Sequence, residues 1–139
     1  MKKTLFILSM ISFLVVANEE KSLFLNLIED NEVKHADEVF ILSYLAKEHK
    51  LQMKWDIEEN YYLYLSSILI MQGDKNLEFK IDEGNIIEHE DEFFGKTQII
   101  RDSLKISLNN VINIEETKVF YQGCADKGFC YPIQSKDLK

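Results

Sequence analysis

Apolar and polar side chains alternate along three separate stretches of the chain. Leu51, Met53 and Trp55 are each followed by a polar residue, and the same period of two recurs in residues 77–81 and 104–108. Because successive side chains of a strand point to opposite faces of a sheet, each stretch predicts a strand that is buried on one face.

Three further runs are rich in β-branched or aromatic residues, which favour strands. They cover residues 39–45, 61–71 and 118–122 and have the length of strands. Turn-forming residues separate the runs at positions 72–74, 82–85 and 109–110. Seven or more short strands at near-regular spacing predict an all-β fold, an antiparallel β-sandwich of the immunoglobulin-like type.

The first seventeen residues have the pattern of a signal peptide. Two lysines precede an uncharged run over residues 4–17, and Val15 and Ala17 supply the small side chains that cleavage requires. A membrane anchor is the alternative, but a helical run of this length spans only about 21 Å of a roughly 30 Å hydrocarbon core. We therefore expect cleavage after Ala17 and export to the periplasm.

The remaining chain divides by pattern into two parts. Residues 18–33 are acidic, with a few apolar residues at helical spacing, so residues 18–36 are expected to form an N-terminal arm, either a short helix or a loose segment. The strand patterns begin after it. Residues 37–139 are therefore expected to form one immunoglobulin-like domain.

Composition and charge narrow the class of partner. Hydrophobic residues make up 46% and aromatic residues 12% of the 139 residues, which is too much for a disordered chain. The net charge of -8 opposes binding to phosphate backbones, because nucleic-acid binders need a basic patch. Nucleic acid is therefore not expected as a partner.

The chain has two cysteines, Cys124 and Cys130, with five residues between them. A strand ending near Cys124, a turn containing Gly128 and a strand starting near Cys130 would form a hairpin whose facing side chains approach disulfide distance. Export permits such a disulfide to persist. Spacing alone leaves two interpretations open: a structural disulfide, the commoner case in exported proteins, and a reactive pair.

The sequence offers little support for a metal site. The cysteines would need further ligands, and His35, His49 and His89 have no spacing that completes a zinc site. We therefore expect no metal and no bound cofactor.

Two aromatic stretches are candidates for a contact surface or a site. Residues 89–96, HEDEFFGK, predict a solvated loop in which Phe93 and Phe94 cannot both face a core, so that at least one lies at the surface. In residues 55–64, WDIEENYYLY, the side chains of Tyr62 and Tyr64 either pack in the core or line a site.

These stretches together resemble the N-terminal periplasmic domain family of the thiol:disulfide interchange protein DsbD. The resemblance starts near Glu38 and runs in the same order through WDIEENYYLY, HEDEFFGK with Ile100-Arg101-Asp102, and YQGCADKGFCYP. It implies an immunoglobulin-like sandwich with a redox cysteine hairpin. The last two motifs are long and unusual, which makes the match specific.

The resemblance also implies roles for single residues. Cys124 and Cys130 fall on the redox pair of the family, Cys130 as the cysteine that joins a partner and Cys124 as the one that resolves the mixed disulfide. Tyr62 and Tyr64 match tyrosines near that pair. The family's cap loop, in which the first phenylalanine shields the cysteines, is matched by Asp91, Glu92, Phe93, Phe94 and Gly95.

Acidic residues near a sulfur have a definite effect on thiol chemistry. A carboxylate of Asp91, Glu92 or Asp126 close to a cysteine would disfavour the thiolate and raise the thiol pKa above its model value of about 8.5. The same carboxylate could accept a proton once a docked partner excludes water.

The implied partners are periplasmic thioredoxin-fold proteins of the disulfide isomerase or cytochrome c maturation type. Full-length family members continue into an eight-helix membrane domain and a thioredoxin-like domain, which this sequence does not contain. Electrons are therefore expected from a separately encoded membrane reductase with a thioredoxin-like domain, or from another part of a longer gene product.

We expect a monomer that acts as a protein-disulfide reductase. The alternative is a non-catalytic periplasmic binding module with a structural hairpin disulfide.

Overall fold

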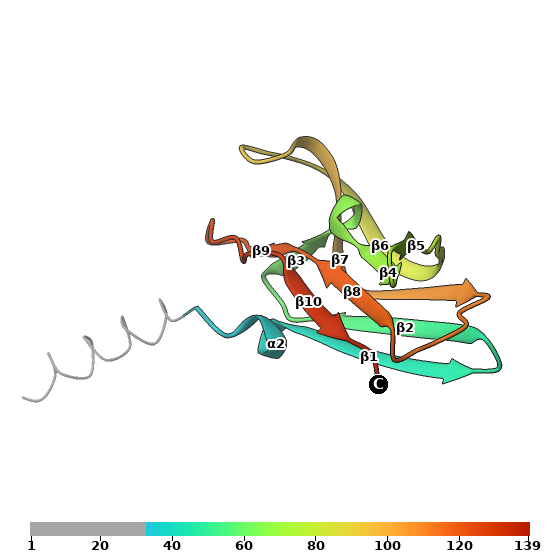
Figure 1. Ribbon diagram of the computed structural model, residues 1–139. Coiled ribbons are helices and arrows are strands. Elements are labelled where there is room, and N and C mark those ends of the chain that lie inside the picture. Colours follow the sequence, from blue (N-terminus) through green and yellow to red (C-terminus); the bar gives the residue numbers. More distant parts are fainter. Residues whose placement is uncertain (1–32) are drawn as a thin grey trace, which may run out of the picture. The chain divides into compact units, whose positions relative to one another are not determined.

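The computed structural model describes residues 33–139, and within them almost every regular element is a β-strand (Figure 1). The predicted signal peptide and most of the predicted N-terminal arm lie outside the described residues. The elements are α2 (Ala36–Val39), β1 (Phe40–Lys47), β2 (Lys50–Ile57), β3 (Tyr61–Tyr64), the 3-10 helix η1 (Leu65–Ser67), β4 (Leu69–Gln72), β5 (Lys75–Asn76), β6 (Lys80–Asp91), β7 (Gly95–Asn109), β8 (Thr117–Tyr121), β9 (Gly123–Ala125) and β10 (Gln134–Asp137).

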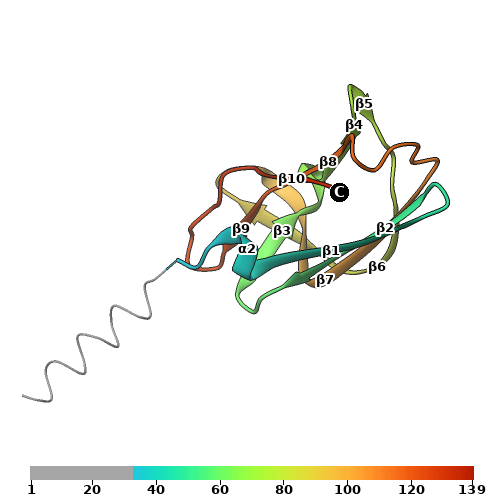
Figure 2. The ribbon, with the colours of Figure 1, turned by 60° about the horizontal axis from the view of Figure 1, so that its bottom comes forward.

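The strands form two antiparallel sheets that pack as a sandwich (Figures 1 and 2). The larger sheet has the order β1-β2-β7-β3-β9, with β6 paired to β7, and the smaller has the order β10-β8-β4-β5. The predicted all-β sandwich of the immunoglobulin-like type is thereby confirmed. No helix within residues 33–139 is long and apolar enough to cross a membrane.

Strict alternation predicted the centre of the core correctly. In the larger sheet, β2 and β7 place Leu51 opposite Leu108 and Trp55 opposite Leu104, and all four side chains are buried. Burying an aliphatic or aromatic side chain of this size contributes about 1.5–3 kcal/mol. These residues belong to the main core, a single cluster of buried side chains between the two sheets.

The prediction of one strand over residues 61–71 is wrong. The run is divided into β3, η1 and β4, which carry the chain from the larger sheet to the smaller one. Ser67 is the local cause, because its hydroxyl donates a hydrogen bond to the Tyr64 carbonyl at 2.7 Å and closes a tight turn of backbone.

The predicted strand over residues 77–81 is shifted. Leu77 is buried, but its N–H donates to the Ile70 carbonyl at 2.8 Å outside any strand, and β6 starts only at Lys80. The predicted turn at 72–74 is confirmed by the β4–β5 hairpin, where Gly73 has a φ of 56°.

The predicted turn at 82–85 is also wrong, because β6 continues through it with irregular pairing. The register against β7 shifts between Ile81 and Glu83 and again between Gly84 and Asn85. On the opposite strand Asp102 has a φ of 61°, and the Asn85 side-chain amide donates to its carboxylate at 2.8 Å. The turn-forming residues 82–85 therefore lie in a β-bulge within the long β6–β7 hairpin.

Candidate functional site

The cysteines lie outside the main core, in a smaller second cluster on the other face of the larger sheet. The second cluster consists of Tyr62, Tyr64, Ile99 and Cys124, all buried, with the partly buried Cys130 packed against them. Alternation along the strands explains its position. Leu63 of β3 and Ile100 of β7 belong to the main core, so their neighbours in sequence point to the opposite face.

Cys124 and Cys130 are joined by a disulfide, with Cα atoms 4.0 Å apart. A Gly128-containing turn, as predicted, connects them, and Gly128 has a φ of 88°. The predicted strand starting near Cys130 is not formed, since Cys130 makes only an isolated bridge to Cys124. Cys124 is fully buried on β9, whereas Cys130 is partly exposed, so the two sulfurs differ in access.

Gly123 allows β9 to lie against β3. A Cβ at this position would be 2.4 Å from the Tyr62 carbonyl oxygen and 2.5 Å from Cζ of Phe40. No side chain fits there without displacing backbone. The glycine before the first cysteine therefore fixes where Cys124 sits on the sheet.

Tyr64 connects the disulfide to the β6–β7 hairpin. Its hydroxyl donates to Asp91 Oδ2 at 2.5 Å, and its Oη lies 3.3 Å from Cys124 Sγ. Burial, followed by the hydrogen bond to Asp91, raises the pKa of Tyr64 well above its usual value. The hydroxyl therefore stays protonated, and its oxygen faces the sulfur as a potential acceptor.

Asp91 shapes the turn between β6 and β7. Its Oδ1 accepts hydrogen bonds from the backbone N–H groups of Phe93 and Phe94, at 2.8 and 2.7 Å. Desolvation acts to raise the pKa of Asp91, but these bonds and that from Tyr64 outweigh it and hold the pKa below its usual value. Asp91 is paired with Gly95, and Glu92 is exposed in the turn between them.

The prediction that residues 89–96 form a solvated loop is only partly right. His89, Glu90 and Asp91 belong to β6 and Gly95 and Lys96 to β7, so the turn itself is short. Both phenylalanines are at the surface, with exposed fractions of 66% for Phe93 and 48% for Phe94. Phe94 makes the ring contact with Tyr64, at 4.5 Å between centroids. The shielding role that the resemblance gives to Phe93 stays a prediction.

Arg101 and His89 also reach the site, although the sequence pattern predicted a site role for neither. Arg101 lies over the ring of Tyr62, 5.3 Å from its centroid, and the ring of His89 lies 5.2 Å from that of Tyr62. Arg101 also forms an ion pair with Asp126, in the loop between the cysteines. Arg101 belongs to the Ile100-Arg101-Asp102 segment of the family resemblance. Its contacts with Tyr62 and Asp126 depend on the register of the strands, which a sequence motif does not specify.

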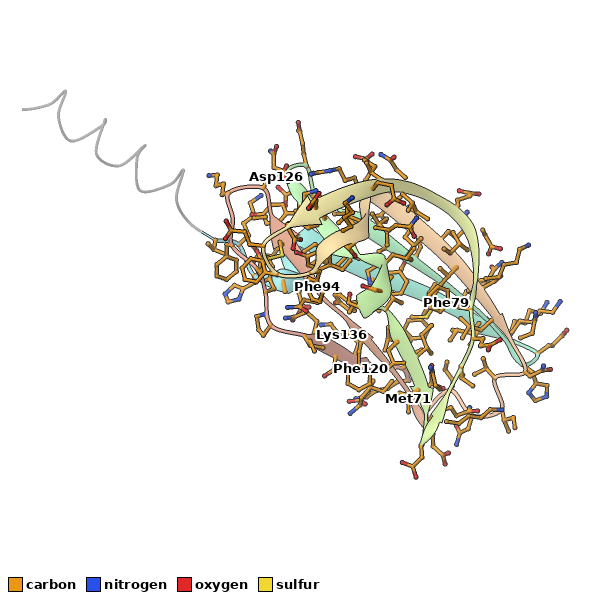
Figure 3. All side chains as sticks on the ribbon, turned by 90° about the horizontal axis from the view of Figure 1, so that it is seen from above. Met71, Phe79, Phe94, Phe120, Asp126 and Lys136 are labelled. Atoms are coloured by element: carbon orange, nitrogen blue, oxygen red, sulfur yellow. A yellow bond between two sulfur atoms is a disulfide. The ribbon has the colours of Figure 1, made fainter. Side chains whose placement is uncertain are left out.

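Figure 3 shows Phe94 and Asp126 toward one end of the domain, away from Met71. Within residues 33–139, no group of three or more His, Cys, Asp or Glu side chains is arranged to hold a metal ion. The side chains that contact one another at this end of the domain are the cysteine pair, the tyrosines and the charged residues around them.

Comparison with known proteins places these features in a family. Residues 30–139 match the family described as thiol:disulfide interchange protein DsbD, N-terminal. The chain is 38% identical over 106 residues to the DsbD proteins of Escherichia coli K12 and Citrobacter koseri, covering 74% of this chain. The match covers 18% of the length of those relatives.

Two solved structures have a similar fold. The reduced DsbD N-terminal domain of Neisseria meningitidis matches with a TM-score of 0.64 and 24% identity, over 76% of this chain and 86% of that one. The complex between the DsbD and PilB N-terminal domains from the same organism matches with a TM-score of 0.55 and 20% identity, over 78% and 87%. Together with the matched family residues, this shows that the chain belongs to the family of DsbD N-terminal domains.

Proposed function

We propose that this protein is a periplasmic thiol–disulfide exchange domain that passes electrons from a membrane reductase to thioredoxin-fold proteins. The observation that carries the proposal is the unequal access of the two sulfurs. Cys130 is partly exposed and can meet a partner, whereas Cys124 is buried against Tyr64 within the same disulfide. A purely structural disulfide does not need this difference.

The reaction transfers two electrons and needs no cofactor besides the cysteine pair. In the reduced domain the Cys130 thiolate attacks a partner disulfide, whose sulfur–sulfur bond breaks as a mixed disulfide forms. Cys124, as a thiolate, then attacks Cys130 Sγ. The partner leaves as a dithiol, having gained the two electrons and the two protons that the cysteines lose. The membrane reductase, through its thioredoxin-like domain, restores the reduced pair.

Tyr64 and Asp91 support the resting state of Cys124. Because the Tyr64 hydroxyl donates its hydrogen bond to Asp91, the Tyr64 oxygen can accept a hydrogen bond from the Cys124 thiol after reduction. A hydrogen bond to the neutral thiol disfavours the thiolate. Cys124 therefore stays protonated until the mixed disulfide has formed, which limits unselective exchange.

Exposed aromatic side chains lie in the cysteine loop and in the β6–β7 turn, and they fit a protein partner. Phe129 directly precedes Cys130 and is 41% exposed, and Phe93 and Phe94 project from the β6–β7 turn. Aromatic side chains are enriched where proteins dock. The related Neisseria complex between a DsbD N-terminal domain and a PilB N-terminal domain supports a protein partner for this domain.

Trapping with single-cysteine variants tests the proposal. The Cys124→Ala variant should accumulate as a mixed disulfide between Cys130 and an oxidised periplasmic thioredoxin-fold protein, because the resolving thiol is missing. The Cys130→Ala variant should not accumulate. Equal trapping by both variants, or by neither, would contradict the proposed roles.

Titration in a graded dithiol buffer separates shuttling from the binding-module alternative. A structural disulfide has a reduction potential below about -300 mV, whereas exchanging proteins lie above it. We expect the Cys124–Cys130 pair in the exchanging range. A value far below it would favour the non-catalytic module.

A further inference from the structure

We infer that Arg101 is a positioning residue for thiol–disulfide exchange. Its guanidinium holds the loop between the two cysteines against β3 and neutralises Asp126, so that this carboxylate does not oppose thiolate formation at the cysteine pair. The inference rests on the proposed function and adds to it a residue outside the cysteine and cap-loop motifs.

The contact between Arg101 and Asp126 is bidentate. Arg101 Nη2 donates to Oδ1 at 2.8 Å, and Nη1 donates to Oδ2 at 3.1 Å. Two parallel bonds from a planar guanidinium fix the orientation of both groups, which a single lysine contact cannot do. The hydrogen bond with Asp126 raises the pKa of Arg101, so the guanidinium stays cationic at every relevant pH.

The same guanidinium also rests on the second cluster. Its Cζ is 5.3 Å from the centroid of Tyr62, and Tyr62 is paired with Cys124 across β3 and β9. The Asp126 N–H donates to the Asn60 carbonyl at 2.8 Å, so the cysteine loop is attached to the start of β3 by backbone as well. Arg101 therefore joins β7, β3 and the cysteine loop at one point.

The charge of Asp126 matters because this residue lies in the short loop between the two cysteines. Asp126 is two residues after Cys124, so their Cα atoms are at most about 7 Å apart. An uncompensated carboxylate in the vicinity of a thiol disfavours the thiolate, and a paired cation reduces that effect. The other titratable or charged groups around the site are Tyr62 and Tyr64 from β3, His89 and Asp91 from β6, Asp102 from β7, Glu92 from the turn, and Lys127 from the cysteine loop.

Alkylation of the reduced full-length chain as a function of pH tests the inference. Arg101→Gln should raise the apparent thiol pKa of the reduced cysteine pair by about half to one unit. At a pH below that pKa, alkylation should slow roughly threefold to tenfold. Asp126→Asn should shift the profile in the opposite direction. The Arg101→Gln, Asp126→Asn double variant should return close to the parent, because both charges are gone.

A merely structural role predicts a different outcome. Loosening of the loop would move the profiles of both single variants in the same direction, and that result would overturn the inference. Lys105→Gln is a matched control, because Lys105 also lies on β7 and forms an ion pair, at 3.3 Å, with Glu83 of β6. A shift in Arg101→Gln no larger than in Lys105→Gln would also overturn it.

A conservative variant and an assay without a partner protein separate the role of Arg101 from a folding defect and from the proposed function. If Arg101→Gln does not fold, Arg101→Lys should keep the parent thiol pKa, since it preserves the charge, while Asp126→Asn still lowers it. The titration uses a small alkylating reagent and no partner protein. A failure of partner trapping with intact opposite shifts would therefore reject the proposed function without rejecting the role of Arg101.

Discussion

At the residue scale, two buried tyrosines differ in what their hydroxyl groups meet. The Tyr131 hydroxyl donates to the Lys34 carbonyl at 2.7 Å. The Tyr121 hydroxyl has no hydrogen-bond partner among the described residues, and burial raises the pKa of Tyr121 to about 12. A buried polar group without a partner carries its full desolvation cost, so the two residues should respond oppositely to loss of the hydroxyl.

We expect Tyr121→Phe to raise the free energy of unfolding by about 1 kcal/mol, because it removes the unpaired hydroxyl. The matched variant, Tyr131→Phe, should lower it by about 1 kcal/mol, because it leaves the Lys34 carbonyl without its donor. Urea unfolding of both variants measures the difference. Destabilisation by Tyr121→Phe equal to that by Tyr131→Phe would show that the Tyr121 hydroxyl is satisfied in solution.

The two phenylalanines of the β6–β7 turn should also differ. Phe94 contacts Tyr64, which in turn lies beside Cys124, whereas Phe93 is the more exposed. We expect Phe94→Ala to accelerate reduction of the disulfide by a small dithiol more than Phe93→Ala does. Reduction rates measured on the folded oxidised protein decide between them. A larger effect of Phe93→Ala would support the shielding role that the family resemblance assigns to Phe93.

At the scale of elements, the turn between β1 and β2 has an unusual backbone conformation for its residues. The β1–β2 turn consists of Glu48 and His49, whose φ angles of 49° and 64° are those of a type I′ turn. His49 is anchored there, since its Nδ1 lies 3.2 Å from the Val111 carbonyl and its own carbonyl accepts the Val111 N–H. Glu48 occupies a left-handed conformation in which asparagine or glycine is usual.

Glu48→Asn should therefore stabilise the protein by about 0.5–1 kcal/mol, because asparagine tolerates a positive φ better than glutamate. Glu59→Asn is the control, since Glu59 is an exposed turn residue that is not among those with positive φ. Denaturation midpoints of the two variants test the difference. A gain from Glu59→Asn as large as that from Glu48→Asn would contradict an origin in backbone strain.

The β6–β7 turn should loosen in acid. The pKa of Asp91 is lower in the folded protein than its usual value of about 3.9, so its stabilising contribution is complete above that value. The contribution is lost as the pH falls through the folded-state pKa. Protonation of Asp91 weakens its bonds to Tyr64, Phe93 and Phe94 and should uncover the disulfide.

A phosphine reductant, which works in acid, can measure this effect. The ratio of the reduction rate of the parent to that of Asp91→Asn should rise as the pH falls below about 3.9, because only the parent titrates at this position. A ratio that stays constant down to the pH at which the domain unfolds would show that Asp91 does not control access to the disulfide.

The elements also show what the sequence could and could not predict. Strands with strict alternation, such as the one containing Leu51 and Trp55, were predicted correctly because burial of one face requires that pattern. The break at Ser67 and the bulge opposite Asp102 were not. The Ser67 hydroxyl bonds to the backbone of Gln122 as well as to the nearby Tyr64 carbonyl, and the bulge depends on the pairing of β6 with β7. The same applies to the site. Pairing of Cys124 with Cys130 is local, whereas Arg101 reaches Asp126 only through the register of β7.

At the scale of the whole molecule, stability and chemistry occupy separate clusters. The main core contains Trp55 but neither cysteine, and the second cluster contains both. The disulfide closes a short loop, for which the chain-entropy estimate is about 2.4 kcal/mol. Its loss should therefore weaken the fold without dismantling it.

We accordingly expect the reduced protein to keep its native fold. The fluorescence emission of Trp55, the single tryptophan, should stay at the wavelength of a buried indole after reduction. The unfolding free energy should fall by no more than about 2.4 kcal/mol, measured in urea with and without dithiothreitol. A red shift of the emission on reduction alone would show that the two clusters unfold together.

Residues of the two clusters alternate along β3, and this alternation determines what a substitution in the strand affects. Tyr62 and Tyr64 belong to the second cluster, whereas Leu63 between them belongs to the main core. Neighbouring positions therefore carry different constraints, one set from the surroundings of the disulfide and the other from the interior of the sandwich. A substitution at Tyr62 or Tyr64 changes the environment of the cysteines, whereas a substitution at Leu63 changes the packing that holds the two sheets together.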